Sequence, residues 1–146
     1  MTPSLILTYT ACGIFFLTGL VTGVWKYYHI HSSEEAQAPV YVDIAHRSSL
    51  MYSFATLVLA KFVELSPYSE TITFWSAAAP IVFFALAIST YVIHGILKDT
   101  DNQMKKPHKL GTFTLPNWMI ITFMMALTIA EIGGFVILFV GFLSTL

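Results

Sequence analysis

The clearest candidate for chemistry in this sequence is His46, which lies near the start of an apolar stretch from Val42 to Leu65. Successive helix residues are rotated by about 100°, so the small or polar residues that follow His46 share one face about 80° wide. They are Ser49, Ser53, Thr56, Ala60 and Glu64. An imidazole at the head of such a face, near one membrane surface, can bind a metal or haem iron, or donate a hydrogen bond. We therefore take His46 as the candidate metal ligand.

The other four histidines give weaker signals. His29 and His31 form an H-x-H pair in a polar connector, where two imidazoles can bind a metal but most often face water. His94 lies near the end of the third apolar stretch, and His108 lies in the connector after it. If the second and third apolar stretches form antiparallel helices, His46 and His94 lie at similar depth and can meet. His94 is therefore a second candidate ligand for a cofactor.

A single carboxylate interrupts the last apolar stretch. Glu131 lies near its middle, where an isolated charge is costly and usually marks a pathway, an ion pair or a function. Lys61 falls at a comparable depth, to within about one helical turn, so a buried pair of Lys61 and Glu131 is geometrically feasible. The alternative role for Glu131 is a polar clasp between helices.

The elements that must position these residues are helices in a membrane. The 146-residue chain is 56% hydrophobic and only 10% charged, far from the composition of soluble domains. A transmembrane helix needs roughly 20 mainly apolar residues, and four stretches provide them. We predict an all-α, integral membrane four-helix bundle that forms a single domain over residues 1–146. The predicted helices span about residues 5–26, 43–65, 71–97 and 116–145.

The distribution of charge predicts the orientation of this bundle. Lysine and arginine residues flank or occupy the first and third connectors, Tyr27–Tyr41 and Lys98–Thr114, which the positive-inside rule places in the cytoplasm. Both termini then face outward (N-out and C-out) in a multi-pass protein of a bacterial inner membrane, surrounded by membrane lipids. The net charge of −1 argues against nucleic acid as a partner. Small residues such as Gly19 and Gly23 allow close helix contacts, within the chain or between copies.

Three segments together resemble a known family. They are FFLTGLVTG at the end of the first helix, IAHRSSLMYS around His46, and GGFVILFVGFL in the last helix. With four spans in about 150 residues, the chain resembles the small membrane isomerases that include styrene oxide isomerase and hydroxylaminobenzene mutase. The resemblance implies a homotrimer that binds haem b near the membrane surface, with His46 as the axial ligand. It also implies a ferric iron that acts as a Lewis acid, accepting an epoxide oxygen before a hydride shift gives an aldehyde.

Charged and aromatic residues near these segments are the further site candidates. Arg47 is adjacent to the implied ligand and is suited to pair with a haem propionate, and Lys26 is a second candidate for that role. The family has an asparagine six residues after the histidine, where this chain has Tyr52. The epoxide isomerases also have an aspartate and a tyrosine in the third helix. This chain has no carboxylate in Thr71–Leu97, and Tyr91 is its only tyrosine there.

Two classes of function follow. In the first, the chain is a haem-dependent isomerase, with Tyr52 and Tyr91 as catalytic candidates and a small apolar substrate that arrives through the lipid phase. In the second, it is a non-catalytic haem or structural subunit of a larger membrane complex, in which His46 and His94 both ligate iron or neither does. A structural subunit without a cofactor is the plainest form of the second class.

Overall fold

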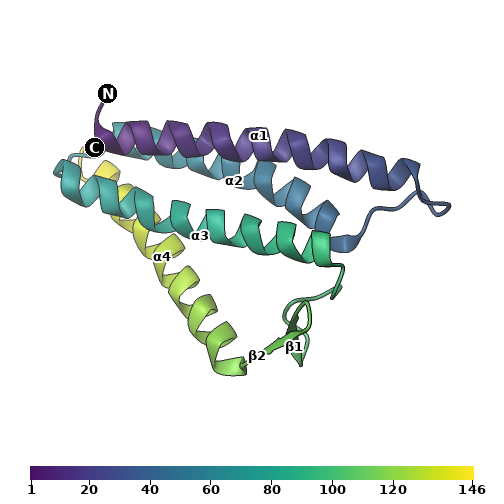
Figure 1. The fold of residues 1–146 in the computed structure, drawn as a ribbon. Coiled ribbons are helices and arrows are strands. Elements are labelled where there is room, and N and C mark those ends of the chain that lie inside the picture. The colour runs from purple at the N-terminus through teal and green to yellow at the C-terminus, as the bar shows by residue number, and fades with distance from the viewer.

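The computed structural model describes all residues from 1 to 146, and four long helices make up most of the chain (Figure 1). A short antiparallel hairpin lies between the last two helices. The elements are α1 (Pro3–His31), α2 (Val40–Glu64), α3 (Glu70–Leu97), β1 (His108–Leu110), β2 (Phe113–Leu115) and α4 (Asn117–Leu143). The all-α class is therefore confirmed. The two termini lie at the same end of the molecule, as an even number of long antiparallel helices requires.

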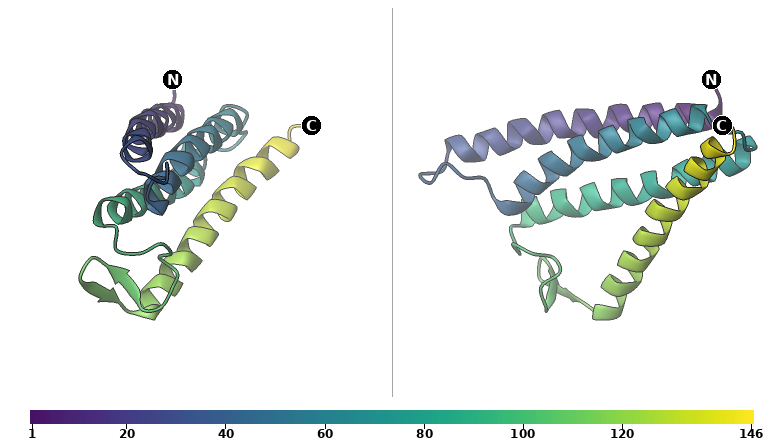
Figure 2. Two further views of the ribbon diagram at one scale, coloured as in Figure 1. Left: turned by 90° about the vertical axis from the view of Figure 1, so that its right-hand side faces the viewer. Right: turned by 180° about the vertical axis from the view of Figure 1, so that it is seen from behind.

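Three of the helices, α1, α3 and α4, are long and apolar enough to cross a membrane by their length and composition. The prediction of apolar spans is confirmed for these three. The helix α2 does not reach the same hydropathy, because polar and charged residues interrupt it. It lies between α1 and α3 and contacts both (Figure 2). A helix that is covered by its neighbours needs less apolar surface than one that faces lipid.

The contact between α1 and α2 is built mainly from small residues, with Phe15 as the one large side chain of the buried α1 face. The buried face of α1 consists of Ser4, Thr8, Ala11, Phe15, Gly19 and Thr22. The predicted polar face of α2 is buried as well: Ser49, Ser53, Thr56 and Ala60 are all inaccessible or nearly so. Ser53 donates a hydrogen bond across the contact to the Cys12 carbonyl at 3.0 Å. The prediction that α2 turns this face toward other helices is therefore confirmed for these four residues. It is wrong for Glu64, which the face was also predicted to include, because Glu64 is exposed and pairs with Lys61.

The helix α4 packs against the bundle mainly through its C-terminal half. Its buried residues are Gly134, Leu138 and Gly141, all in the C-terminal half. Gly134 lies against the Ser76 carbonyl and the ring of Pro80 in α3. Toward its N-terminus α4 diverges from α3, and the connector with the hairpin lies between the separated ends (Figures 1 and 2). The four helices, predicted to form a bundle, thus leave an opening between α3 and α4 at one end.

Two local features differ from the sequence prediction. The helix α1 continues to His31, so His29 and His31 lie in its last turn and not in a loop. No glycine or proline occurs between residue 26 and Ser32, where the helix ends with the Ser32 hydroxyl donating to the Tyr28 carbonyl at 2.8 Å. The hairpin was not predicted. Its two-residue turn uses Gly111 with φ of 60°, a conformation that glycine adopts without strain.

The contact between α3 and α4 gives a matched pair of glycine substitutions. In Gly134→Ala the added methyl group meets the backbone carbonyl of Ser76, which cannot rotate away, whereas the neighbouring Gly133 has open space around it. We expect Gly134→Ala to lower the free energy of unfolding by about 1–3 kcal/mol. Gly133→Ala is expected to be neutral or slightly stabilising. Unfolding in detergent, followed by circular dichroism, measures both, and equal stability of the two variants would contradict this packing.

Candidate functional site

The imidazole ring of His46 makes a hydrogen bond to α1. Its Nδ1 lies 2.8 Å from the Gly19 carbonyl oxygen, which can only accept, so Nδ1 carries the proton of this hydrogen bond. A Cβ at Gly23 would touch the imidazole, which means that the glycine provides the space for the ring. The Nε2 atom makes no hydrogen bond within the chain. In the neutral ring Nε2 therefore presents a lone pair.

An ion-pair network lies one turn from this histidine. The Lys26 ammonium group is 2.5 Å from one Asp43 oxygen, and the Arg47 guanidinium is 2.7 Å from the other. Asp43 thus links the end of α1 to the first turns of α2. The two cations predicted to pair with haem propionates, Lys26 and Arg47, lie together at the same end of the helices as His46. Asp43, which holds them, was not among the predicted residues.

His94 has different partners from His46. Its Nδ1 lies 2.7 Å from Asp99 Oδ1, and the Gly111 backbone N–H donates to Asp99 Oδ2 at 2.5 Å. The side chains of this pair are only 5% and 7% exposed. The ring of Tyr41 covers His94 at a centroid distance of 5.0 Å. No hydrogen bond or ring contact joins His94 to His46, so the structure does not bring the two candidate ligands together.

The surroundings of Asp99 favour its charged form. Burial alone would raise the pKa of Asp99, but the hydrogen bonds from His94 and from the Gly111 amide outweigh it and hold the pKa below its ordinary value. An ionised Asp99 accepts a hydrogen bond from the Nδ1–H group of His94. That bond fixes the ring orientation and, in the neutral imidazole, leaves Nε2 unprotonated.

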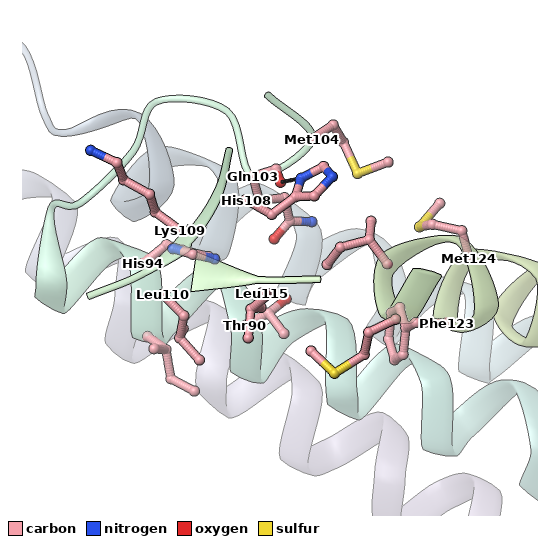
Figure 3. A pocket seen from close by; sticks show the side chains of 13 residues that line it. Thr90, His94, Gln103, Met104, His108, Lys109, Leu110, Leu115, Phe123 and Met124 are labelled. Carbon is pink, nitrogen blue, oxygen red and sulfur yellow. Dashed lines mark hydrogen bonds between the residues drawn. The ribbon is translucent and has the colours of Figure 1, made fainter. Parts of the chain in front are cut away.

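A cavity of about 280 Å³ adjoins His94 (Figure 3). It lies between the C-terminal end of α3, the connector with the hairpin, and the N-terminal half of α4. Most of its walls are apolar, with Phe123 and the side chains of Met104, Met119 and Met124 among them. No residue of α1 or α2 contributes to it. The cavity is therefore separate from the surroundings of His46.

The predicted catalytic tyrosines lie inside the bundle. Tyr52 stacks on Phe84 of α3 with ring centroids 4.4 Å apart, and Tyr91 stacks on Tyr41 at 6.1 Å. Tyr91 and Glu131 both lie within electrostatic range of the Tyr52 hydroxyl. Because Tyr52 faces α3 whereas His46 faces α1, the two residues do not line a common site within one chain. A catalytic role for either tyrosine stays a sequence prediction.

Glu131 and Lys61 are not paired in the structure. Lys61 is exposed and bonds to Glu64 one turn later, at 2.8 Å. The Oε1 atom of Glu131 is buried and makes no hydrogen bond. Lys61 has the nearer partner on its own helix, since residues three apart on a helix are neighbours. Glu131 is thus a solitary carboxyl close to Tyr52.

Sequence reasoning missed Asp99, which is the main partner of His94. Four residues and a helix end lie between the two, and this spacing corresponds to no ligand motif. Side chains of His, Cys, Asp and Glu do not form any group of three or more that could hold a metal ion. A haem, by contrast, needs as few as one protein ligand.

Comparisons of the chain with protein-family models, with curated proteins and with solved structures find no match. Function is therefore inferred from the contacts of the chain itself.

The environment of Asp99 predicts that the free energy of unfolding depends on pH. The folded chain keeps Asp99 charged at pH values where the unfolded chain binds a proton, so this stabilisation is complete above the unfolded pKa of about 3.9. It is lost as the pH falls through the lower folded pKa. We expect Asp99→Asn to reduce the free energy of unfolding by about 1–3 kcal/mol at pH 7, and the difference from wild type to shrink below about pH 4.

Denaturant unfolding of wild type and Asp99→Asn at pH 7, 4 and 3 measures this difference. Asp101→Asn is the matched control, because Asp101 is exposed in the same connector. A difference that is constant over this pH range would contradict the charged state of Asp99 in the fold.

Proposed function

We propose that this chain is an integral membrane protein that binds haem b through His46 and catalyses a redox-neutral isomerisation of a small apolar substrate. The observation that supports this proposal best is the hydrogen bonding of His46. Its Nδ1 proton is held by the Gly19 carbonyl, while Nε2 is free to ligate a metal. Imidazole ligands of metals commonly have this arrangement, in which a carbonyl or carboxylate on the second nitrogen fixes the ring.

The residues around His46 fit a haem with one protein ligand. The imidazole is half-buried on a helix and is held over Gly23, so its orientation is set before any ligand binds. Lys26 and Arg47 share the single carboxylate of Asp43, and Arg47 remains largely exposed. Both cations are positioned to pair with propionate groups. When bound, ferric haem would supply a Lewis acid for a substrate oxygen.

In this proposal α2 is the fourth transmembrane helix, and the chain has the N-out, C-out orientation in a bacterial inner membrane. The shared location of the termini supports an even number of crossings. The outer faces of α1 and α4 expose mainly apolar side chains, which suit membrane lipids or further copies in a homotrimer. Substrate then reaches the protein through the lipid phase.

The alternative is a structural or non-catalytic subunit of a membrane complex. It is favoured by the fact that the bond from His46 to Gly19 is also an ordinary polar contact between two helices. Ligation of one iron by both His46 and His94 receives no support, since His94 is bonded to Asp99 and lines a separate cavity. Haem content distinguishes the proposal from a cofactor-free subunit.

Substitution of His46 tests the ligand assignment. We expect His46→Ala, expressed with haem supplied, to retain less than about a tenth of the haem bound by wild type, because the only proposed axial ligand is gone. Haem is measured as the pyridine haemochrome of the purified protein, and helical content by circular dichroism.

The matched control is His31→Ala, since His31 is exposed in the last turn of α1. It is expected to bind haem like wild type. Full haem content in a folded His46→Ala variant would exclude His46 as the ligand.

A further inference from the structure

The cavity beside His94 has features that the proposed haem site does not use. Two buried polar side chains line it, His94 and His108, each about 5% exposed. His108 is engaged at both nitrogens, by the Gln103 carbonyl at 3.1 Å and by Asn117 Oδ1 at 3.2 Å. The Thr90 hydroxyl, which also lines the cavity, donates to the Ala87 carbonyl at 2.8 Å. Of the two buried histidines, only His94 has a ring nitrogen without a partner.

In the neutral imidazole that nitrogen is a hydrogen-bond acceptor. The Asp99 carboxylate accepts two hydrogen bonds, from the Gly111 amide at Oδ2 and from His94 Nδ1 at Oδ1. The carboxylate can only accept, so Nδ1 bears the proton, and in the neutral ring Nε2 has the lone pair. His94 Nε2 is not among the buried atoms that lack a partner, so some of its surface is accessible, and His94 lines the cavity. A group that donates a hydrogen bond would satisfy it.

The other residues that line the cavity indicate what the rest of a ligand molecule must be like. Eight of the 13 lining residues are hydrophobic, and methionine side chains adapt to different apolar shapes. The volume of about 280 Å³ is at the small end of ligand pockets. The cavity lies beside the ends of α3 and α4, two helices that are long and apolar enough to span a membrane. Molecules that combine an apolar body with one polar group concentrate at this depth.

We propose that this cavity binds a small aromatic or aliphatic molecule with a single hydroxyl group, which donates a hydrogen bond to His94 Nε2 while its apolar body contacts Phe123 and the methionines. The site is independent of haem, because it shares no residue with the surroundings of His46. Asp99 acts here as a positioning residue for the imidazole.

A pair of fluorinated probes tests this proposal. 4-Fluorophenol has the hydroxyl donor, and 4-fluoroanisole has the same ring with the donor methylated. Each is titrated into the full-length protein in detergent, and ¹⁹F NMR measures saturable binding. We expect 4-fluorophenol to saturate, and 4-fluoroanisole to bind at least about threefold more weakly, as the loss of one hydrogen bond predicts. The visible spectrum is recorded at each addition and is expected not to change.

Two variants and one control complete the test. His94→Phe keeps an aromatic side chain without the acceptor and is expected to remove the preference for the phenol. Met119→Trp fills the cavity from α4 and is expected to weaken both probes at least about tenfold. His31→Gln, outside the cavity, is expected to behave like wild type. Circular dichroism verifies that each variant is folded.

Four results would overturn the proposal: no saturable binding of either probe to wild type, equal affinities for the two probes, an unchanged phenol preference in His94→Phe, or a haem spectrum that shifts in step with phenol binding. The last result would place the phenol at the haem iron. Loss of haem in His46→Ala with phenol binding retained would separate the two sites. Failure of the haem proposal therefore leaves the cavity proposal standing, and the reverse also holds.

Discussion

The close contact between α1 and α2 is the constraint on which the rest of the structure depends. Without large side chains at Gly19 and Gly23, the two backbones approach closely enough for a side chain of one helix to reach a carbonyl of the other. His46 and Ser53 both do so. Other hydroxyls of the α2 face, such as those of Ser49 and Thr56, bond to carbonyls of their own helix. The polar groups of this buried face are therefore hydrogen-bonded without water, as buried polar groups generally are.

This arrangement places both candidate site histidines, His46 and His94, toward the same end of the helices. The helix α4 contacts the bundle through glycines in its C-terminal half, where small residues permit close packing, and its other half diverges. The connector folds into the space between the diverging ends and brings Asp99 to His94. Two histidines thus become separate candidate sites. His46 is oriented by a backbone carbonyl, whereas His94 is oriented by a carboxylate beside an apolar cavity.

The sequence was sufficient to predict the helices and the buried polar face of α2, because hydrophobic length and helical periodicity are local properties. It also indicated that Lys26 and Arg47 lie near His46. It did not predict the partner of His94, since the pairing with Asp99 depends on how a connector of irregular conformation folds back. It suggested Lys61 as a partner for Glu131 from depth alone, whereas Lys61 bonds to Glu64 on its own helix. Depth along a helix does not determine the face on which a side chain lies.

The visible absorption spectrum of the detergent-purified protein, oxidised and reduced, tests the central claim most directly. Binding of haem by His46 alone predicts a Soret band that shifts when imidazole or carbon monoxide is added, because one axial position is open. A band that does not respond to either ligand would contradict an open site and indicate two axial ligands. The absence of a Soret band, with haem supplied during expression, would contradict haem binding itself.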